Sequence, residues 1–234
     1  QGALTLAITN DPESPLAAAA GYCLPCHAGQ ERSIAATKTY TAQLAALALL
    51  ATALADDPAM WAELERLPAQ VERALELAPE VERRVERYRY MQSCVIIGRG
   101  YNYATAREIA LKLKELTYVV AEPYSSADFM HGPIAILEPG VPALLVAPGG
   151  AVYDDLVALA ESMRQREAEL VIISDRPQAL ELAQTPLRLP EPAPEWLSPV
   201  VAVVPGQLFA ASLTRAKGYD LDHPRGLRKV TRTT

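Results

Sequence analysis

The stretch that decides the fold is SCVIIGRGYNYATAREIALKLKEL, residues 93–116. Its apolar start, residues 93–97, predicts a buried β-strand, and Gly98-Arg99-Gly100 predicts a tight turn. Residues 104–116 then carry apolar side chains at helical spacing. A continuous apolar strand that leads through a turn into a helix is typical of a parallel sheet with helices on both faces. The stretch therefore predicts an α/β fold.

The same alternation continues toward the C-terminus. We expect strands at 143–147, 170–174 and 200–204, and helices at 153–167, 177–183 and 208–217. Between the two halves of this pattern, residues 121–133 (AEPYSSADFMHGP) read as a long polar loop. Strands that alternate with helices predict a doubly wound parallel sheet.

The N-terminal part resembles a smaller unit of the same kind. It predicts strands at 3–9 and 22–27 and helices at 14–20 and 33–55. A charged helical stretch with three prolines follows. We therefore expect a partial first α/β unit over 1–56, a helical linker over 57–90, a second unit over 91–219 and a tail over 220–234.

Composition narrows the class of protein. Half of the 234 residues are hydrophobic, enough for a sizeable core, and the net charge of −6 argues against a dedicated nucleic-acid or anionic-membrane binder. The sequence has no apolar run of about 18 residues without charges, so it predicts no membrane-spanning helix. Three cysteines do not make a disulfide framework, so we expect a cytoplasmic protein.

Three charged residues of the helix at 104–116 share one face. Glu108, Lys112 and Glu115 lie at positions i, i+4 and i+7. One interpretation is a solvated, salt-bridged stripe. The other is a pair of carboxylates around a lysine that transfers protons near a ligand. His131, in the polar loop, is either a loop or cap residue or a group that titrates near neutral pH.

Two further motifs bear on cofactor binding. Cys23-Leu24-Pro25-Cys26-His27 matches the haem-attachment pattern C-x-x-C-H, but no signal peptide precedes it and it falls on a predicted strand. A redox C-x-x-C is also disfavoured, because such motifs usually open a helix after a strand and this one falls on a predicted strand. We therefore expect the spacing of the two cysteines to have no function. The turn at 98–100 lacks the third glycine of a dinucleotide site because residue 103 is Tyr. We expect no cofactor and no metal.

Ligands of open parallel sheets bind at the carboxyl ends of the strands. This rule points to the loops at 98–103, 148–152 and 174–177 of the second unit, and at 10–14 and 27–33 of the first. The basic tail is either a frayed terminus or a segment that folds over a site and presents a lysine to an anionic substrate.

Together these segments resemble the sugar isomerase (SIS) family of phosphosugar enzymes. The resemblance is carried by ALTLAITN, ERSIAATKTYTAQLAAL, GRG with AREIALKLKEL, AEPYSSADFMHGP and DHPRGLRKVTRT, at 3–10, 31–47, 98–116, 121–133 and 222–233. It is strongest to the isomerase half of glucosamine-6-phosphate synthases and to SIS-type glucosamine-6-phosphate deaminases. The family's fold is two SIS units, each a five-stranded parallel sheet flanked by helices, so the first unit here looks incomplete at its N-terminus.

The resemblance also implies roles for the candidate residues. Glu115 looks like the base that moves a proton between C1 and C2, with Lys112 and Glu108 as its companions in positioning and ring opening. His131 looks like the ring-opening residue that a neighbouring subunit supplies, which implies a homodimer with shared sites. Lys229 matches the tail lysine that forms a Schiff base with the open-chain sugar.

The resemblance places the substrate contacts on two segments. Ile34, Ala36 and Thr37 match a loop that lines the sugar, and Arg228 is grouped with them as a substrate-binding residue of the tail. Synthases have Ser-Thr-Lys where this chain has Ala36-Thr37-Lys38, which favours the deaminase branch, as does the ending KVTRT.

Two parts of the family pattern have no counterpart in residues 1–234. One is the glutaminase domain, so glutamine-fed synthesis is not expected. The other is the Ser/Thr-rich phosphate loop S-x-S-G-x-T, which in the family precedes the strand that opens this sequence. The sequence also starts without Met, so we expect a fragment of a longer enzyme.

The expected reaction is conversion of glucosamine 6-phosphate to fructose 6-phosphate and ammonia through an enediol-type intermediate. The alternatives are a plain phosphosugar isomerase, a deglycase of sugar-amine 6-phosphate adducts, a non-catalytic phosphosugar-binding SIS protein and an inert structural fragment. Substrate comparison separates the enzymes. A regulator of this class usually carries a helix-turn-helix domain, which residues 1–234 lack.

Overall fold

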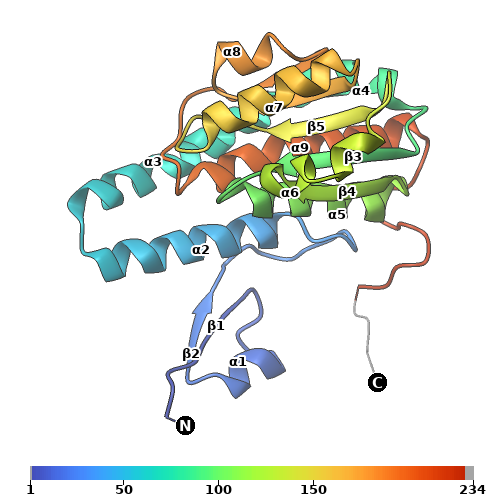
Figure 1. Ribbon diagram of the computed structural model, residues 1–234. Coiled ribbons are helices and arrows are strands. Elements are labelled where there is room, and N and C mark those ends of the chain that lie inside the picture. The colour runs from blue at the N-terminus through green and yellow to red at the C-terminus, as the bar shows by residue number, and fades with distance from the viewer. Residues whose placement is uncertain (1, 230–234) are drawn as a thin grey trace.

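The computed structural model describes residues 2–229, which form two parallel sheets of unequal size (Figure 1). The small sheet pairs β1 (Leu6–Thr9) with β2 (Tyr22–Pro25), and α1 (Pro15–Ala19) joins them. The large sheet has five strands in the order β4-β3-β5-β6-β7. Their bounds are Ser93–Gly98 (β3), Val120–Ser125 (β4), Pro142–Val146 (β5), Glu169–Ser174 (β6) and Thr185–Arg188 (β7).

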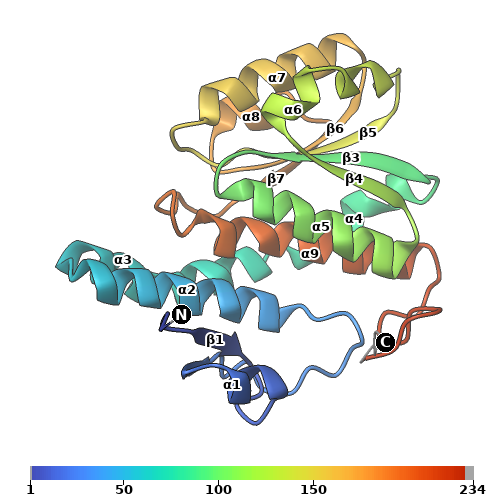
Figure 2. The same ribbon diagram turned by 60° about the horizontal axis from the view of Figure 1, so that its bottom comes forward.

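Helices cover both faces of the large sheet (Figure 2). One face carries α4 (Ala78–Val85), α5 (Asn102–Thr117) and α9 (Ser198–Ala216), with α2 (Lys38–Ala55) and α3 (Pro58–Leu75) packed outside them. The other face carries α6 (Ser126–Met130), α7 (Tyr153–Gln165) and α8 (Pro177–Leu180). Short 3₁₀ turns lie at Glu86–Tyr88 and Pro133–Ile136. All neighbouring strands are parallel, so the predicted α/β fold with a doubly wound parallel sheet is confirmed.

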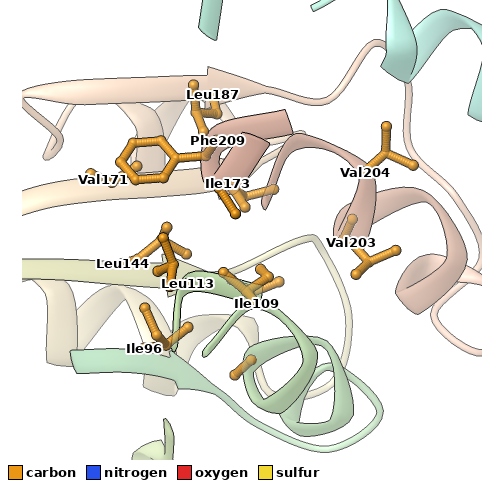
Figure 3. Packing of buried hydrophobic residues seen from close by; sticks show 14 of the residues in the cluster. Ile96, Ile109, Leu113, Leu144, Val171, Ile173, Leu187, Val203, Val204 and Phe209 are labelled. Carbon is orange, nitrogen blue, oxygen red and sulfur yellow. The ribbon is translucent and has the colours of Figure 1, made fainter. Parts of the chain in front are cut away.

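The strands divide their side chains between two cores because successive residues of a strand point to opposite faces. Ile96, Leu144 and Val171 pack toward α5 and α9, where Leu113 and Phe209 meet them (Figure 3). The residues that alternate with these form a second core under α6 and α7: Val95, Ile97, Leu145 and Ile172. The first core also takes in Leu67, Ala74 and Val81 of α3 and α4. We still propose the division of the chain into 1–56, 57–90, 91–219 and 220–234, in which α3 and α4 connect the two sheets. The last five residues of that tail lie outside the described residues.

The strand predicted at 200–204 is wrong, because these residues belong to α9. The run Val200-Val201-Ala202-Val203-Val204 is wholly apolar and β-branched at every position but Ala202, which is also the composition of a buried strand. Here the helix is enclosed by the sheet on one side and by α2 and α3 on the other, so it needs no polar face. Tertiary packing therefore overrides the local β preference.

The polar loop predicted at 121–133 is also wrong, since most of it forms β4 and α6. β4 and the unpredicted strand β7 are the two edges of the large sheet, and each contains a proline, Pro123 or Pro186. Proline is tolerated in edge strands, where its missing N–H faces away from the neighbour. Other predicted elements are present with shifted ends, as with α2, which begins at Lys38 rather than at residue 33.

Helices α5 and α9 approach most closely at Gly206. A Cβ atom on Gly206 would lie 2.3 Å from Cδ1 of Ile109, a side chain that is fully buried. Alanine normally favours a helix over glycine by about 1 kcal/mol. We expect Gly206→Ala to do the opposite and lower the free energy of unfolding by ~1–3 kcal/mol through overpacking.

Urea unfolding measures this effect. Gly21→Ala is the matched control, because its added Cβ would meet only ordinary contacts at 3.6 Å and its backbone is unstrained. A Gly206→Ala protein at least as stable as the parent would contradict the close approach of the two helices.

Candidate functional site

A cavity of about 410 Å³ lies between the helical layer and the segment that precedes α2. Its polar lining comprises Glu31, Ser33, Thr37, Lys38, Thr41, Lys112, Gln207 and Asp222. Its apolar lining includes Val71, Leu75, Leu116, Val204 and Leu208. The cavity thus joins residues from the loop after β2, from α2, α3, α5 and α9, and from the tail.

The charged row of α5 is buried rather than solvated. The Lys112 side chain is 4% exposed and that of Glu108 6%, while Glu115 is 25% exposed. Lys112 Nζ donates a hydrogen bond of 2.6 Å to Glu115 Oε2 and lies 3.9 Å from Glu108 Oε1. A buried ammonium between two carboxylates is costly to desolvate, which argues against a merely decorative surface stripe.

Glu108 contacts Gln207, whose Nε2 donates a hydrogen bond to Glu108 Oε1 at 3.4 Å. Burial raises the pKa of Glu108 to about 7, while the Lys112 charge and the Gln207 hydrogen bond act in the opposite direction. The neighbouring Tyr40 hydroxyl donates to the Ala104 carbonyl, and burial together with the Glu108 charge raises the pKa of Tyr40 to about 12. Glu108 is therefore a carboxyl that changes its charge near neutral pH.

This raised pKa predicts a pH-dependent stability. A carboxyl that binds its proton more tightly when folded contributes stability below its unfolded pKa, and that stability is lost as the pH rises through the folded pKa. Moving the pKa from 4.5 to about 7 corresponds to about 3 kcal/mol. We expect the unfolding free energy of the parent, relative to Glu108→Gln, to fall by up to that amount between pH 4.5 and pH 7.5.

Urea unfolding at several pH values provides the comparison. Glu122→Gln, on the exposed edge strand, is the control and leaves the pH dependence in place. A constant difference between parent and Glu108→Gln across this range would refute the raised pKa.

The wall formed by residues 31–38 is held by Glu31. Its Oε1 accepts the backbone N–H groups of Thr37 at 3.1 Å and Thr39 at 2.8 Å, at the start of α2. Burial alone would raise the pKa of Glu31, but these N–H donors outweigh it and lower the pKa. The carboxylate thus satisfies the N–H of the N-cap residue Thr37 and the first-turn N–H of Thr39, since the Thr37 side chain makes no capping hydrogen bond.

The tail runs along the same wall. Ser33 Oγ donates to the Leu221 carbonyl at 3.2 Å, and the Ile34 N–H donates to the Asp222 carbonyl at 3.3 Å. Lys229 Nζ donates to the Glu31 carbonyl. Farther along, the Arg225 N–H bonds the Tyr118 hydroxyl at 2.8 Å, and its guanidinium lies 3.9 Å from the Tyr118 ring centre. Leu221 and Asp222 of the tail therefore line the cavity, and Lys229 is bonded to its wall at Glu31.

The structure brings together only part of the predicted site. Thr37 and Lys112 line the cavity, Glu115 is bonded to Lys112, and Lys229 reaches the same wall. Ile34 joins through its backbone only, Ala36 is exposed outside the lining, and Arg228 is exposed.

His131 lies apart from the other predicted site residues. It is exposed at the C-terminal end of α6, on the sheet face opposite α5 (Figure 2). The preceding Phe129 is buried in the second core. Within one chain, His131 therefore does not reach the cavity lined by Lys112.

We expected the ligand site at loops that follow the carboxyl ends of strands. Only one of these five loops lines this cavity. The loop at 27–33 contributes Glu31 and Ser33 to the lining. The loops at 10–14, 98–103, 148–152 and 174–177 contribute nothing to it. Lys112 and Glu115 stand in the last turns of α5, which lie toward the amino ends of the large sheet's strands because α5 runs antiparallel to β3.

Sequence reasoning missed Glu31 and Gln207. The signal for Gln207 was present, since it is the one amide in an apolar helix that packs on the Glu108 face.

Cys23 and Cys26 are both unpaired thiols. Within residues 2–229, no group of three or more His, Cys, Asp or Glu side chains is placed to hold a metal ion. Across the same residues, no helix has the length and apolar character needed to cross a bilayer.

Comparisons with known proteins agree on one family. The model of the SIS domain matches residues 1–53 and 90–215. The chain is 39% identical to glutamine–fructose-6-phosphate aminotransferase [isomerizing] from Gloeobacter violaceus, over 98% of this chain and 39% of that protein. The same enzyme from Thermococcus kodakarensis is also 39% identical, over 97% and 39%. The chain thus spans about two fifths of the length of the curated relatives it matches.

Solved structures show the same architecture. The C-terminal domain of glucosamine-fructose-6-phosphate aminotransferase from Francisella tularensis superimposes with a TM-score of 0.86 and 30% identity, covering 93% of this chain and 64% of that one. Glucosamine-6-phosphate deaminase from Thermotoga maritima has a TM-score of 0.79 at 20% identity, covering 96% and 65%, which is a likeness of fold alone. With a family model that matches most of its length, this chain belongs to the SIS domain family.

Proposed function

We propose that this chain carries out aldose–ketose isomerisation of an amino-sugar phosphate, converting glucosamine 6-phosphate and water to fructose 6-phosphate and ammonia. The observation that supports it most is the ion pair of the buried Lys112 with Glu115, where Lys112 lines a cavity of about 410 Å³, large enough for a sugar. The name of a curated relative adds support, since it joins fructose 6-phosphate with isomerisation.

The proposed chemistry begins with the open-chain aldose. The Glu115 carboxylate takes the proton from C2, the electron pair forms a C1=C2 double bond, and the C1 oxygen gains a proton. Return of a proton from Glu115 to C1 leaves a protonated imine, an iminium, at C2. Water then adds to the imine, and ammonia departs as the ketone forms. Lys112 Nζ stabilises the negative charge that develops on the sugar oxygens.

The other predicted residues keep proposed roles around this step. Glu108 acts in ring opening together with His131 of a second copy, because His131 does not reach the cavity of its own chain. Lys229 can take the place of water at the C2 imine: its amine adds there, ammonia leaves as the lysine Schiff base forms, and water then hydrolyses that base to the ketone and the free lysine. Ile34, Ala36, Thr37 and Arg228 contact the substrate. This arrangement requires a homodimer, which light scattering on the full-length protein tests: an active monomer would contradict it.

The first experiment is incubation of the full-length protein with glucosamine 6-phosphate in the absence of glutamine. We expect ammonium and fructose 6-phosphate in equal amounts. Ketose formation from other phosphosugars, without ammonium, would point to a plain isomerase. Release of the free amine from sugar-amine 6-phosphate adducts would point to a deglycase. Binding without any turnover would point to a non-catalytic phosphosugar-binding protein.

A second candidate follows from curated relatives of this chain that are named aminotransferases, at 34–39% identity. In this case the chain is the isomerase part of an enzyme that runs toward glucosamine 6-phosphate with nitrogen from glutamine. Formation of glucosamine 6-phosphate from fructose 6-phosphate and glutamine, at a rate well above deamination, would favour it.

A further inference from the structure

Gln207 enters the site because of how closely α9 approaches α5. Gly206 has no side chain where a Cβ would collide with Ile109, and this contact brings the next residue, Gln207, against the residue before Ile109, which is Glu108. The preceding Pro205 and Gly206 are both buried, while Gln207 is half-buried at the cavity. The position of the amide is therefore set by the helix packing rather than by a mobile side chain on a surface.

The amide stands between Glu108 and the cavity. Gln207 belongs to the cavity lining, and Glu108 does not. Lys112 Nζ lies closer to Glu115, at 2.6 Å, than to Glu108, at 3.9 Å. Gln207 Nε2 therefore provides the nearer hydrogen-bond donor to Glu108 Oε1, at 3.4 Å.

The charged and titratable groups around Glu108 come from each element that packs there. Lys112 and Glu115 stand on α5 itself, and Tyr40 approaches from α2. Arg107 and Lys114 of α5 line the shallow pocket onto which Glu108 opens on its other side. α9 presents the neutral Gln207.

We propose that Gln207 is a positioning residue, whose amide fixes the Glu108 carboxyl for its proton-transfer role at the cavity. The proton-transfer role of Glu108 rests on the proposed function. The Gln207–Glu108 contact and its effect on the Glu108 pKa do not, because both are measurable without substrate. A donor to a carboxylate stabilises the ionised form, so loss of the amide raises the Glu108 pKa further.

The test uses Gln207→Leu and, as a second variant of similar length and flexibility, Gln207→Met. The first readout is titration of the carboxyl carbons in protein labelled with ¹³C-glutamate, with Glu108→Gln to assign the resonance. We expect the Glu108 pKa to rise by about half a pH unit or more in both variants. Gln70→Leu is the matched control, because it removes a buried amide of α3 that bonds the Pro192 carbonyl and leaves Glu108 untouched.

The second readout is the pH profile of turnover with glucosamine 6-phosphate. We expect the limb that reports Glu108 to move to higher pH, which lowers kcat near pH 7 by about two- to threefold with KM nearly unchanged, far short of the 10²–10⁴-fold loss of an acid–base group itself. An unmoved Glu108 pKa in folded variants overturns the proposal. A moved pKa with an unmoved profile overturns its part in turnover. A parent protein without turnover refutes the proposed function, and the titration still decides the positioning role.

Discussion

Replacing Glu115 by glutamine is expected to lower kcat for glucosamine 6-phosphate turnover by about 10²–10⁴-fold, the range typical of losing a general base. Glutamine keeps the size of the side chain and an oxygen that accepts from Lys112 Nζ, now 2.6 Å from Glu115. It cannot take the C2 proton. The loss should therefore appear in kcat, with little change in KM or in thermal stability.

The measurement is the initial rate of fructose 6-phosphate formation by the full-length protein. Glu122→Gln makes the same chemical change on the exposed edge strand β4, 3.7 Å from Lys114, and should leave the rate intact. If Glu115→Gln retained turnover within a few-fold of the parent, another group would have to be the base.

Lys112→Met is expected to lower turnover by about 10²-fold or more, because it removes an ammonium that lies within 4 Å of both carboxylates. The Lys112 charge also opposes the effect of burial on Glu108, so its loss raises the Glu108 pKa further. In the pH–rate profile of the residual activity, the limb that reports ionisation of Glu108 should then lie at higher pH than in the parent.

Rate measurements across pH 5–9 test both parts of this expectation. Lys114→Met is the matched control, since Lys114 is 43% exposed on the same helix and lies outside the cavity. Equal pH profiles for the two lysine variants would show that Lys112 has no special place in the site.

The sequence predicted the large sheet wherever a strand is apolar on both sides. β3, β5 and β6 are buried on both faces, and each reads as a continuous hydrophobic run. β4 and β7 were missed because edge strands are half-exposed and each contains a proline. α9 was read partly as a strand because enclosure by other elements removes the polar face that identifies a helix.

The candidate site shows a similar limit. Spacing alone put Glu108, Lys112 and Glu115 on one face of α5, which the structure bears out. Spacing carries no information on distant partners, so neither the amide of Gln207 from α9 nor the contact between Lys229 and Glu31 was foreseen. The separation of His131 depends on the sheet lying between α5 and α6.

The prolines of the two edge strands bear on how copies of this protein avoid one another. An uncovered strand edge is a template on which a strand of a second molecule adds, the first step toward fibrils. Pro123 and Pro186 each withhold a donor from the outer row of the large sheet. A fibril nucleus would have to extend past a missing hydrogen bond at either edge, so this fold resists growth by strand addition at both ends of the large sheet.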